Sequence, residues 1–413
     1  MELGTTKLDV LIFGGGASGL WILDRLRRVG YRALLLESTA LGAGQTIQAQ
    51  GIIHGGGRYA LRGVKDFAAV QAIREMPDRW RRHLRGEAPP DLRSVPLRSD
   101  RCLLWLPRGG WGARLQAWGF QSVVSRAGLL AVRPEPLPRE EWPEILRESA
   151  QAVFTMAEPV IDPAALLEAL AAPHRDCIRR YDPGPGTRNV ETLSDGHIRI
   201  NSLALTLHSR AVVLAAGEGN AALLERFGSE PALMQRRPLG MVLLRGDLPP
   251  LFGHCMVGGK VHLTITAAKD TTGRIVWQVG GEIAERLAAI DDPATARRLA
   301  AEEIRRLLPG LELARIEITV HRAVRAEART GDQRRPSGVQ ISRVAPHVFA
   351  TWPTKLALVP VLADEVLAEL AVELKGPGRY DAPVEFPGEP PPAVAPPPWE
   401  SAEWYPVPSA APA

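Results

Sequence analysis

Three glycines and one glutamate near the N-terminus have the residue types and the spacing that bind a dinucleotide. Gly14, Gly16 and Gly19 form the pattern G-x-G-x-x-G, and Glu37 follows Gly19 by 18 residues. In this motif the first glycine permits a tight turn, the second lets the backbone approach a pyrophosphate, and the third lets a helix pack against a strand. The acid can accept both hydroxyls of an adenosine ribose, and its charge disfavours a 2′-phosphate.

The elements predicted around these residues are those that the motif requires. An apolar run at 10–13 indicates a strand before the glycines, apolar residues at helical spacing over 20–29 indicate a helix, and the run 33–36 is typical of a second strand. The N-terminus of such a helix offers unpaired N–H groups and a positive dipole end to phosphates. The alternative is an ordinary strand–helix–strand unit with a glycine turn, which the agreement of these features disfavours.

The length and composition of the chain exclude several classes of protein. At 413 residues it exceeds the roughly 250–300 at which a single core stops growing, so two lobes are expected. No apolar run reaches the roughly 18 residues of a membrane helix, and residues 1–7 lack the features of a signal peptide, which predicts a cytoplasmic protein. Cys102, Cys177 and Cys255 lie far apart, so we expect small buried side chains rather than disulfides or metal ligands.

The net charge of +4 does not indicate a nucleic-acid partner. Basic side chains are almost all arginine, and the densest group, residues 74–85, also contains Glu75 and Asp78. Such a mixture is typical of a solvated helix face, whereas nucleic-acid binding needs a concentrated basic patch with aromatic residues for base stacking.

Two further sets of segments are predicted to build the two lobes. Residues 160–170 form a helix with Asp162 at its N-cap, 187–208 contain short β-prone runs around the turn Ser194-Asp195-Gly196, and 211–214 form a buried strand. The segments 85–150 and 232–325 instead predict an antiparallel sheet, with a turn at Gly273-Arg274. Its expected strands are 101–107, 237–244, 261–267, 274–279 and 314–320, beside an amphipathic helix over 293–308; β character returns at 339–351 before a last helix over 356–374.

One segment resembles a known family. Residues 44–59 read Gly-Gln-Thr-Ile-Gln-Ala-Gln-Gly-Ile-Ile-His-Gly-Gly-Gly-Arg-Tyr, which is similar to the segment after the second strand in FAD-dependent oxidoreductases of the D-amino-acid oxidase superfamily. Gln45-Thr46, Gly51, Ile53-His54 and Gly56 resemble L-2-hydroxyglutarate oxidase. Ile53–Gly56 with Arg58-Tyr59 resembles flavin-dependent glycerol-3-phosphate dehydrogenase. Residues 212–217 are similar to the second FAD motif of the family, and the resemblance covers roughly residues 8–374.

The resemblance implies an α/β protein with a two-lobe, FAD-binding Rossmann-type fold and an antiparallel β-sheet substrate domain. FAD rather than NAD is expected at the glycine motif, without a covalent link. The FAD-binding domain is assigned to 1–84, 151–231 and 326–375, and the substrate domain to 85–150 and 232–325. The tail 376–413 contains 12 prolines in 38 residues, which predicts an extended or disordered segment.

The residues expected to bind FAD come from the two motifs and from the segment before the last helix. That segment, 349–360, departs from the family because it contains no glycine and places Trp352, Pro353 and Lys355 where small residues are usual. Lys355 could stabilise negative charge on a reduced flavin, although a surface lysine is an equal alternative. The complete expected set is Gly14, Gly16, Ala17, Ser18, Gly19, Glu37, Ser38, Gln45, Thr46, Gly51, Gly217 and Lys355.

The candidate catalytic groups are a histidine and an arginine. His54 is expected to act as a base or an orienting donor, since imidazole titrates near neutral pH; the alternative is a histidine that only bonds backbone near the cofactor. Arg325 resembles the substrate-binding arginine of the family, and a guanidinium binds carboxylate or phosphate in a bidentate fork. Its alternative is a surface ion pair with Glu327, and Arg58 and Tyr59 are second-rank candidates.

One strand of the second lobe offers two more candidates. His262 and Thr264, on the strand 261–267, could face the flavin, although an ordinary alternating strand face is the preferred interpretation. No Ser-His-Asp arrangement and no metal-ligand spacing is present in the sequence, so no metal is predicted.

The function predicted is oxidation of a C–H next to a hydroxyl or amine by hydride transfer to flavin, with oxygen or a quinone as the final acceptor. The expected substrate is a small anionic 2-hydroxy acid, amino acid or polyol phosphate. Two alternatives remain open: a flavin monooxygenase-like enzyme, and a catalytically silent flavin-binding subunit whose proline-rich tail recruits a partner. Peripheral contact with a membrane is compatible with the sequence.

Overall fold

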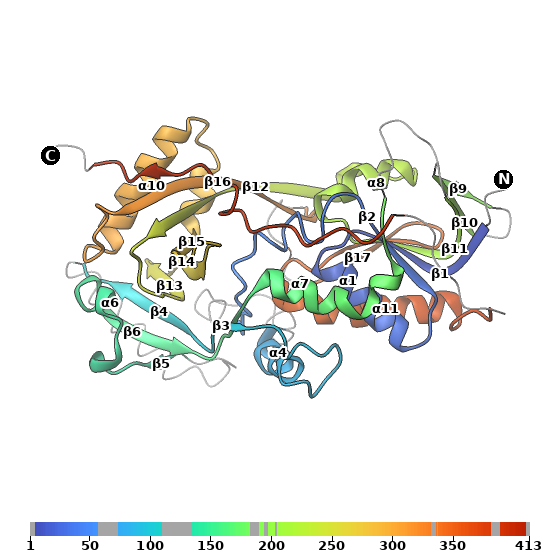
Figure 1. Ribbon diagram of the computed structural model, residues 1–413, viewed down its shortest axis with the longest axis horizontal. Coiled ribbons are helices and arrows are strands. Elements are labelled where there is room, and N and C mark those ends of the chain that lie inside the picture. The colour runs from blue at the N-terminus through green and yellow to red at the C-terminus, as the bar shows by residue number, and fades with distance from the viewer. Residues whose placement is uncertain are drawn as a thin grey trace.

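The computed structural model describes residues 5–56, 73–109, 134–181, 190–193, 197–202, 205–331, 336, 338–380 and 389–409. These residues form two lobes, each built on one large β-sheet (Figure 1). The N-terminal strand belongs to the lobe on the right of the figure, and the last strand of the chain belongs to the lobe on the left. Because the strands of each sheet come from separated segments, the chain passes between the lobes several times.

The sheet of the right-hand lobe is mostly parallel. Its strands are β1 Thr5–Phe13, β2 Ala33–Glu37, β8 Ile178–Arg180, β9 Val190–Thr192, β10 Ile198–Ser202, β11 Leu205–Leu214, β17 Gln340–Ala345 and β18 Val348–Trp352. The order is β17-β18-β11-β1-β2-β8, and the ribbon of β9 and β10 extends from β11. From β18 to β8 the neighbours pair in parallel. The continuous apolar runs of β1 and β2 suit strands that are covered on both faces.

Helices cover both faces of this sheet. The helices are α1 Ala17–Arg28, α4 Met76–Leu84, α7 Pro163–Ala171, α8 Asn220–Arg226 and α11 Val359–Leu374, the last preceded by one 3₁₀ turn, Leu356–Leu358. Val10 and Ile12 of β1 pack in one core with α1, α7 and α11, whereas Leu11 and Phe13 pack in a second core with α8 (Figure 1). The predicted cap of α7 is confirmed, because the carboxylate of Asp162 accepts hydrogen bonds from the backbone N–H groups of residues 164 and 165 at 2.8 and 3.0 Å.

Strand β11 differs from the prediction of a meander followed by a separate strand. It is one strand from Leu205 to Leu214, antiparallel to β10 over its first half and parallel to β1 over most of its length. The polar residues Ser209 and Arg210 interrupt the apolar pattern, yet both are satisfied inside the sheet. The Ser209 hydroxyl donates to a backbone oxygen, and Arg210 bonds the buried carboxylate of Asp9 at 2.7 Å.

The left-hand lobe contains the second sheet. Its strands are β4 Cys102–Pro107, β5 Glu135–Pro136, β6 Ala150–Met156, β12 Met234–Gly246, β13 Gly253–Val257, β14 Lys260–Lys269, β15 Ile275–Gly280, β16 Ile316–Ala328 and β19 Tyr405–Pro406. The order is β19-β16-β12-β15-β14-β13-β4-β6-β5. The predicted antiparallel arrangement is confirmed with one exception, since β13 and β4 pair in parallel. These two strands come from distant segments, so no short turn fixes their relative direction.

One face of this second sheet is covered by helices. They are α6 Glu144–Ser149, α9 Glu282–Leu287 and α10 Pro293–Leu307, and α10 confirms the amphipathic helix predicted over 293–308. Leu263, Trp277 and Val279 pack in the core of this face. A short two-stranded sheet, β3 Leu97–Ser99 with β7 Val160–Ile161, lies apart from both large sheets. None of the helices within the described ranges is both long and apolar enough to cross a membrane.

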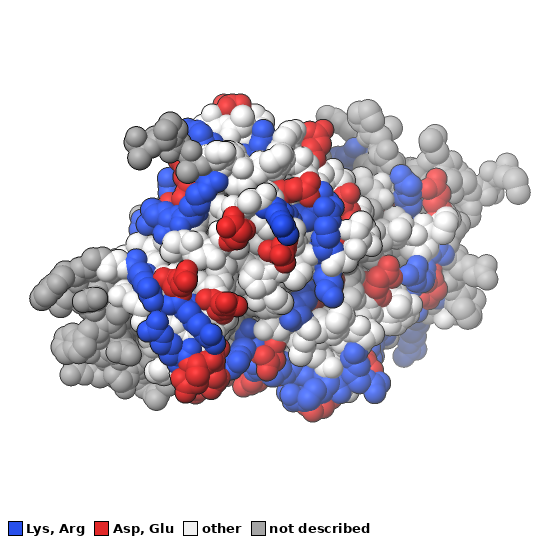
Figure 2. Space-filling view, turned by 60° about the vertical axis from the view of Figure 1, so that its left-hand side comes forward, with Lys and Arg blue, Asp and Glu red and all other residues white. Residues whose placement is uncertain are grey.

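Basic and acidic side chains are mixed on the surface that Figure 2 displays, so this face carries no unbroken basic area among the described residues. The three cysteines, all in described ranges, are buried and form no disulfide, as predicted. Burial raises the pKa of both Cys177 and Cys255 to about 12, which leaves these thiols protonated and unreactive.

Of the two outcomes predicted for the tail, residues 376–380 and 389–409 have the extended one and are not disordered. Trp399 is only 3 % exposed and packs with Leu243 and Val276 of the second sheet, and β19 pairs with the edge strand β16. Near the other lobe, the backbone at Leu41 exchanges hydrogen bonds with residues 393 and 395 at 2.9 and 3.0 Å. Prolines prevent regular structure, but a few aromatic and polar anchors are sufficient to hold an extended chain against two lobes.

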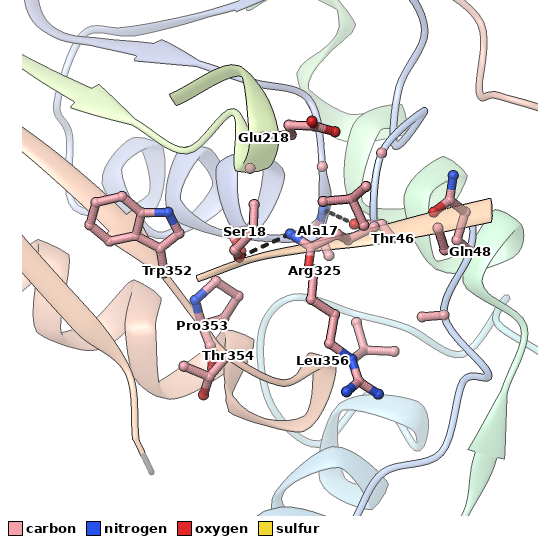
Figure 3. Close-up of a pocket in the computed structure, with 18 of the residues that line it drawn as sticks. Ala17, Ser18, Thr46, Gln48, Glu218, Arg325, Trp352, Pro353, Thr354 and Leu356 are labelled. Carbon is pink, nitrogen blue, oxygen red and sulfur yellow. Dashed lines mark hydrogen bonds between the residues drawn. The ribbon is translucent and has the colours of Figure 1, made fainter. Parts of the chain in front are cut away.

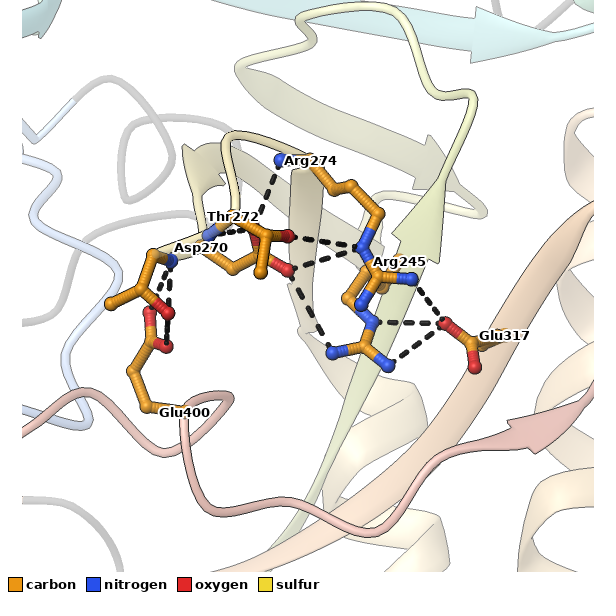
Figure 4. Close-up of polar contacts among 7 residues, drawn as sticks. Arg245, Asp270, Thr272, Arg274, Glu317 and Glu400 are labelled. Carbon is orange, nitrogen blue, oxygen red and sulfur yellow. Dashed lines mark hydrogen bonds and ion pairs between the residues drawn. The ribbon is translucent and has the colours of Figure 1, made fainter.

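The tail also carries a carboxylate that clamps a turn. Glu400 accepts hydrogen bonds from the backbone N–H and the hydroxyl of Thr271 at 3.1 and 2.7 Å, at the turn between β14 and β15 (Figure 4). Beside it, Arg245 is bound to Glu317 at 2.9 Å, and its guanidinium lies over the ring of Trp404.

Replacing Trp399 with alanine is expected to destabilise the protein by about 3 kcal/mol, at the lower end of the usual cost of truncating a core tryptophan. We expect a cost at the lower end of that range because the apolar cluster around Trp399 is small. Urea unfolding would measure it. Val372→Ala is the matched control because Val372 is 79 % exposed. Equal stability of the two variants would contradict the docking of the tail.

Candidate active site

A cavity of about 1250 Å³ lies between the two lobes. Its walls come from the loops at the carboxyl ends of β1, β2 and β11 and from β12, β14 and β16 of the second sheet. Ligands of open α/β sheets bind at this end of parallel strands. Figure 3 shows part of this lining, with Ala17, Ser18 and Thr46 from the first lobe, Arg325 from β16, and Trp352, Pro353, Thr354 and Leu356 from the segment before α11.

The three motif glycines have different structural tasks. Gly14 has a φ of +107°, and a Cβ there would lie 2.5 Å from the Cα of Ala216 at the end of β11. A Cβ on Gly19 would lie 1.9 Å from the Gly14 oxygen, so Gly19 is required for close packing of α1 and does not line the cavity. Gly16 has an ordinary φ of −76°, lines the cavity, and a Cβ there would meet only Thr46 Oγ1 at 3.2 Å.

The N-terminus of α1 faces the cavity beside Gly16. Its first turn contains no acidic side chain, so the positive end of the helix dipole is not neutralised within the helix. Ala17 and Ser18 line the cavity, and the backbone N–H of Ala17 donates to Thr46 Oγ1 at 3.1 Å. This arrangement suits a pyrophosphate.

Glu37, at the end of β2, also lines the cavity together with Ser38. One carboxylate oxygen accepts from the backbone N–H of Gly15 at 2.6 Å and the other from that of Thr39 at 2.9 Å. These bonds orient the carboxylate. The oxygen that Gly15 bonds keeps a further lone pair for a ribose hydroxyl, whereas the other also accepts from the Thr39 hydroxyl at 3.2 Å.

The remaining residues expected at a cofactor lie around the same cavity. Gln45 lines it and donates to the backbone oxygen of Ala326 at 3.2 Å, which connects the loop to β16. Gly51 and Gly217 also line the cavity, with φ of +75° and +57°. A Cβ on Gly51 would lie 2.1 Å from the oxygen of Ile161, so the close approach of two backbones requires this glycine.

The segment before the last helix closes another part of the cavity. Lys355 lines it and is only 7 % exposed, so the alternative of a surface lysine is wrong. A turn in which Thr354 has a φ of +58° precedes it. The bulky Trp352 of this segment also lines the cavity and is 1 % exposed.

His54 lies on the cavity wall with its side chain 17 % exposed. Behind it, Nδ1 is 3.3 Å from Oε2 of Glu158, and the ring of His254 lies 5.7 Å from its own. The sequence analysis missed Glu158 and His254, because they come from segments about 100 and 200 residues away. Arg58 and Tyr59 lie outside the described residues.

Arg325 lines the cavity from β16. Its guanidinium is 3.5 Å from Glu285, whereas Glu327 pairs with Arg237 at 3.1 Å. Arg237 and Arg325 are cross-strand neighbours on β12 and β16, so both reach the same wall, and the sequence analysis missed Arg237.

His262 and Thr264 do not share a face, contrary to the alternation expected of them. The register between β13 and β14 shifts where Met256 pairs with Val261 and Cys255 pairs with Leu263, which makes His262 the additional residue of a β-bulge. Thr264 therefore lines the cavity, whereas His262 binds Glu282 and Glu303 at 3.2 and 3.4 Å.

These features fit a flavin dinucleotide better than a small ligand alone. The cavity exceeds the 300–1000 Å³ that is typical of small-ligand sites. Gly16 leaves a path beside a helix N-terminus that a Cβ would fill, and an oriented carboxylate stands at the end of the next strand. Gly14–Ser18 and Thr46 would hold the pyrophosphate, and Glu37 would hold the ribose.

Comparisons with known proteins agree with the geometry. The model of the family described as FAD dependent oxidoreductase matches residues 9–351. A Pseudomonas aeruginosa protein named "Probable FAD-dependent oxidoreductase" is 37 % identical over 401 residues, covering 95 % of this chain and 98 % of that protein. The crystal structure of that FAD dependent oxidoreductase has a TM-score of 0.78, with 34 % identity, and covers 96 % and 98 % of the two chains.

More distant structures share the fold. Glycine oxidase from Geobacillus kaustophilus has a TM-score of 0.63 at 15 % identity, covering 91 % of this chain and 97 % of its own. L-alpha-glycerophosphate oxidase from Mycoplasma pneumoniae with FAD bound has a TM-score of 0.60 at 16 % identity, covering 88 % and 94 %. The chain therefore belongs to the FAD dependent oxidoreductase family, and it is an enzyme whose cofactor is FAD.

Proposed function

We propose that this oxidoreductase oxidises a small anionic 2-hydroxy acid, amino acid or polyol phosphate, with oxygen or a quinone as the final electron acceptor. The observation that carries the proposal is that His54, from the first lobe, and Arg325, from the second, line the same cavity as the cofactor motif. A proton acceptor and an anion-binding cation are the two groups that such a substrate needs from the protein.

FAD supplies the two-electron acceptor when it is bound, and the protein supplies position and proton transfer. Arg325 binds the carboxylate or phosphate of the substrate and thereby orients the neighbouring C–H bond. His54 removes the proton of the hydroxyl or amine as the hydride leaves carbon, so that a carbonyl or imine forms.

One partner of Arg325, Glu285, is held by a contact that a substrate can displace. Glu285 is 57 % exposed and its carboxylate lies 3.5 Å away, and exposed pairs of this kind contribute only ~0–1 kcal/mol. By contrast, Arg237 is held by Glu327, whose side chain is 1 % exposed. The two arginines therefore differ in role, with Arg325 the one that binds substrate.

Arg325→Lys is expected to impair turnover nearly as much as Arg325→Ala, because lysine keeps the charge but loses the bidentate fork. The loss in apparent substrate binding should be about 2–5 kcal/mol, with FAD content unchanged. Steady-state kinetics measure the first quantity and the visible spectrum the second. Arg298→Lys is the matched control, since Arg298 pairs with Glu302 on an exposed helix face. Affinity equal to the unsubstituted enzyme in both Arg325 variants would remove this arginine from the site.

The function itself is tested by anaerobic bleaching of the bound flavin. The purified protein is mixed with a panel of 2-hydroxy acids, amino acids and polyol phosphates, and the flavin absorbance is followed. Reoxidation by oxygen or by a soluble quinone then identifies the acceptor class. Bleaching by none of these compounds would favour the catalytically silent flavin-binding subunit.

A further inference from the structure

Glu158 is a buried carboxylate with three neighbours that together determine its state. Its side chain is 1 % exposed, and Oε1 accepts from the backbone N–H of Gly55 at 2.8 Å. Oε2 lies 3.3 Å from His54 Nδ1 and 3.8 Å from His254 Nε2. Burial raises the pKa of Glu158, but the contacts with the two histidines outweigh it, and the pKa remains well below its usual value.

An ionised carboxylate can only accept hydrogen bonds, so this contact fixes the tautomer of His54. The proton of the neutral ring must stay on Nδ1, which donates to Glu158. Nε2, at the opposite edge of the ring, is then the atom with a lone pair. In a base that serves the cavity, this is the nitrogen that must be unprotonated.

His254 is placed to hold Glu158 but not to meet a substrate. Its side chain is completely buried on β13, whereas His54 is on the cavity wall. Nδ1 of His254 lies 3.0 Å from the hydroxyl of Thr264, which itself lines the cavity. His254 is therefore hydrogen-bonded to Thr264 on one cavity wall and makes an ion-pair contact with Glu158, which in turn bonds His54 on another wall.

We propose that Glu158, supported by His254, is a positioning residue that holds His54 with its proton on Nδ1 and with Nε2 available to remove the substrate proton. The proposal rests on the function proposed above for His54. It adds a carboxylate–histidine pair whose members lie 104 residues apart in the chain.

Glu158→Gln tests the proposal with an isosteric side chain. The N–H of Gly55 must still meet an acceptor, so the amide oxygen will occupy the Oε1 position and the NH₂ group will face the histidines. His54 Nδ1 then becomes the acceptor and the proton moves to Nε2. Flavin reduction by substrate should slow by about 10²–10⁴-fold, the usual effect of losing a general base, while FAD remains bound.

The direct readout is the tautomer of His54, measured by ¹⁵N NMR of histidine-labelled holoenzyme without substrate. The chain has nine histidines, and the spectrum of His54→Gln identifies the signal. The expected result is an Nδ1–H tautomer in the unsubstituted enzyme and an Nε2–H tautomer in Glu158→Gln. An unchanged tautomer would overturn the proposal. A changed tautomer in a protein that no test substrate reduces would instead contradict only the proposed function.

Asp24→Asn is the matched control, because Asp24 is also 1 % exposed and binds a buried histidine, His174, at 3.0 Å outside the cavity. It should change neither the His54 signal nor the reduction rate. If Glu158→Gln does not fold, Glu158→Asp keeps the charge but withdraws the carboxylate by ~1.5 Å, which should produce a mixture of tautomers.

The ligand atoms of His54, Glu158 and His254 also lie within 4.8 Å of one another, a geometry that a metal ion can share. Metal analysis of the purified enzyme distinguishes a metal site from the positioning role proposed here. One equivalent of zinc in the unsubstituted enzyme, absent from Glu158→Gln, would overturn the positioning role. The expected result is no stoichiometric metal in either protein.

Discussion

Gly16→Val is expected to yield a folded protein that has lost FAD. The backbone at Gly16 has a φ of −76°, which valine tolerates, and the added side chain would meet only Thr46 Oγ1 before it enters the cavity. It would therefore occupy the path of the pyrophosphate. Losing two charge-assisted hydrogen bonds of ~1.5–3 kcal/mol each corresponds to roughly 10²–10⁴-fold weaker binding.

The measurement is the flavin released by heat or acid from the purified variant, followed by titration with FAD. Gly331→Val is the matched control, because a Cβ at Gly331 has no neighbour within 4 Å and this residue does not line the cavity. The circular dichroism of both variants should equal that of the unsubstituted protein. Full flavin content in Gly16→Val would contradict the assignment of the glycine motif. Flavin that neither heat nor acid releases from the unsubstituted protein would contradict the expected non-covalent link.

The motif could be predicted because its requirements are local. A buried parallel strand, a glycine turn and an amphipathic helix each leave a pattern within a few residues, and β1, α1 and β2 follow that pattern. The helices α7, α10 and α11 were predictable for the same reason, since caps and periodicity are properties of neighbouring residues.

Features set by distant partners could not be predicted from local patterns. In the sequence, the charged Arg210 indicates the end of a buried strand. In the structure its charge is neutralised by Asp9, which belongs to another strand. The many prolines of the tail disfavour regular structure, and its ordered position depends on the packing of Trp399 against Leu243 and Val276. In both cases the partner that allows the residue to be buried lies far away in the sequence, so the neighbouring residues do not predict the burial.

The candidate site divides in the same way. The cofactor residues lie in two short motifs, whereas the wall that faces the substrate is assembled from β12, β14 and β16. The bulge at His262 breaks the in–out alternation of side chains that a regular strand has, and no residue type in the segment indicates that a bulge is present. Glu327 is the acid nearest to Arg325 in sequence, and the two residues lie on the same face of β16 because they are two positions apart. Glu327 nevertheless pairs with Arg237, which comes from β12, a strand far away in the sequence.

His54→Gln is expected to slow flavin reduction by the substrate by about 10²–10⁴-fold, with FAD still bound. Its ring lies on the cavity wall and contacts the buried carboxylate of Glu158, an arrangement suited to a base rather than to a bond with backbone alone. Stopped-flow absorbance under anaerobic conditions measures the rate. His262→Gln is the matched control, because His262 pairs with Glu282 and Glu303 and does not itself line the cavity, so the flavin of this variant should be reduced at the normal rate.

The pH dependence provides the second part of this test. Only the neutral imidazole can accept a proton, so the reduction rate of the unsubstituted enzyme should rise with pH as His54 loses its proton, and this rise should be absent from His54→Gln. Glutamine keeps much of the polarity of histidine but cannot titrate, which separates proton transfer from simple orientation. Reduction of His54→Gln at the normal rate, with the same pH profile, would leave His54 as a neighbour of the cofactor without a chemical role. The base would then have to be sought elsewhere on the cavity wall, where Lys355 is a titratable side chain that is only 7 % exposed.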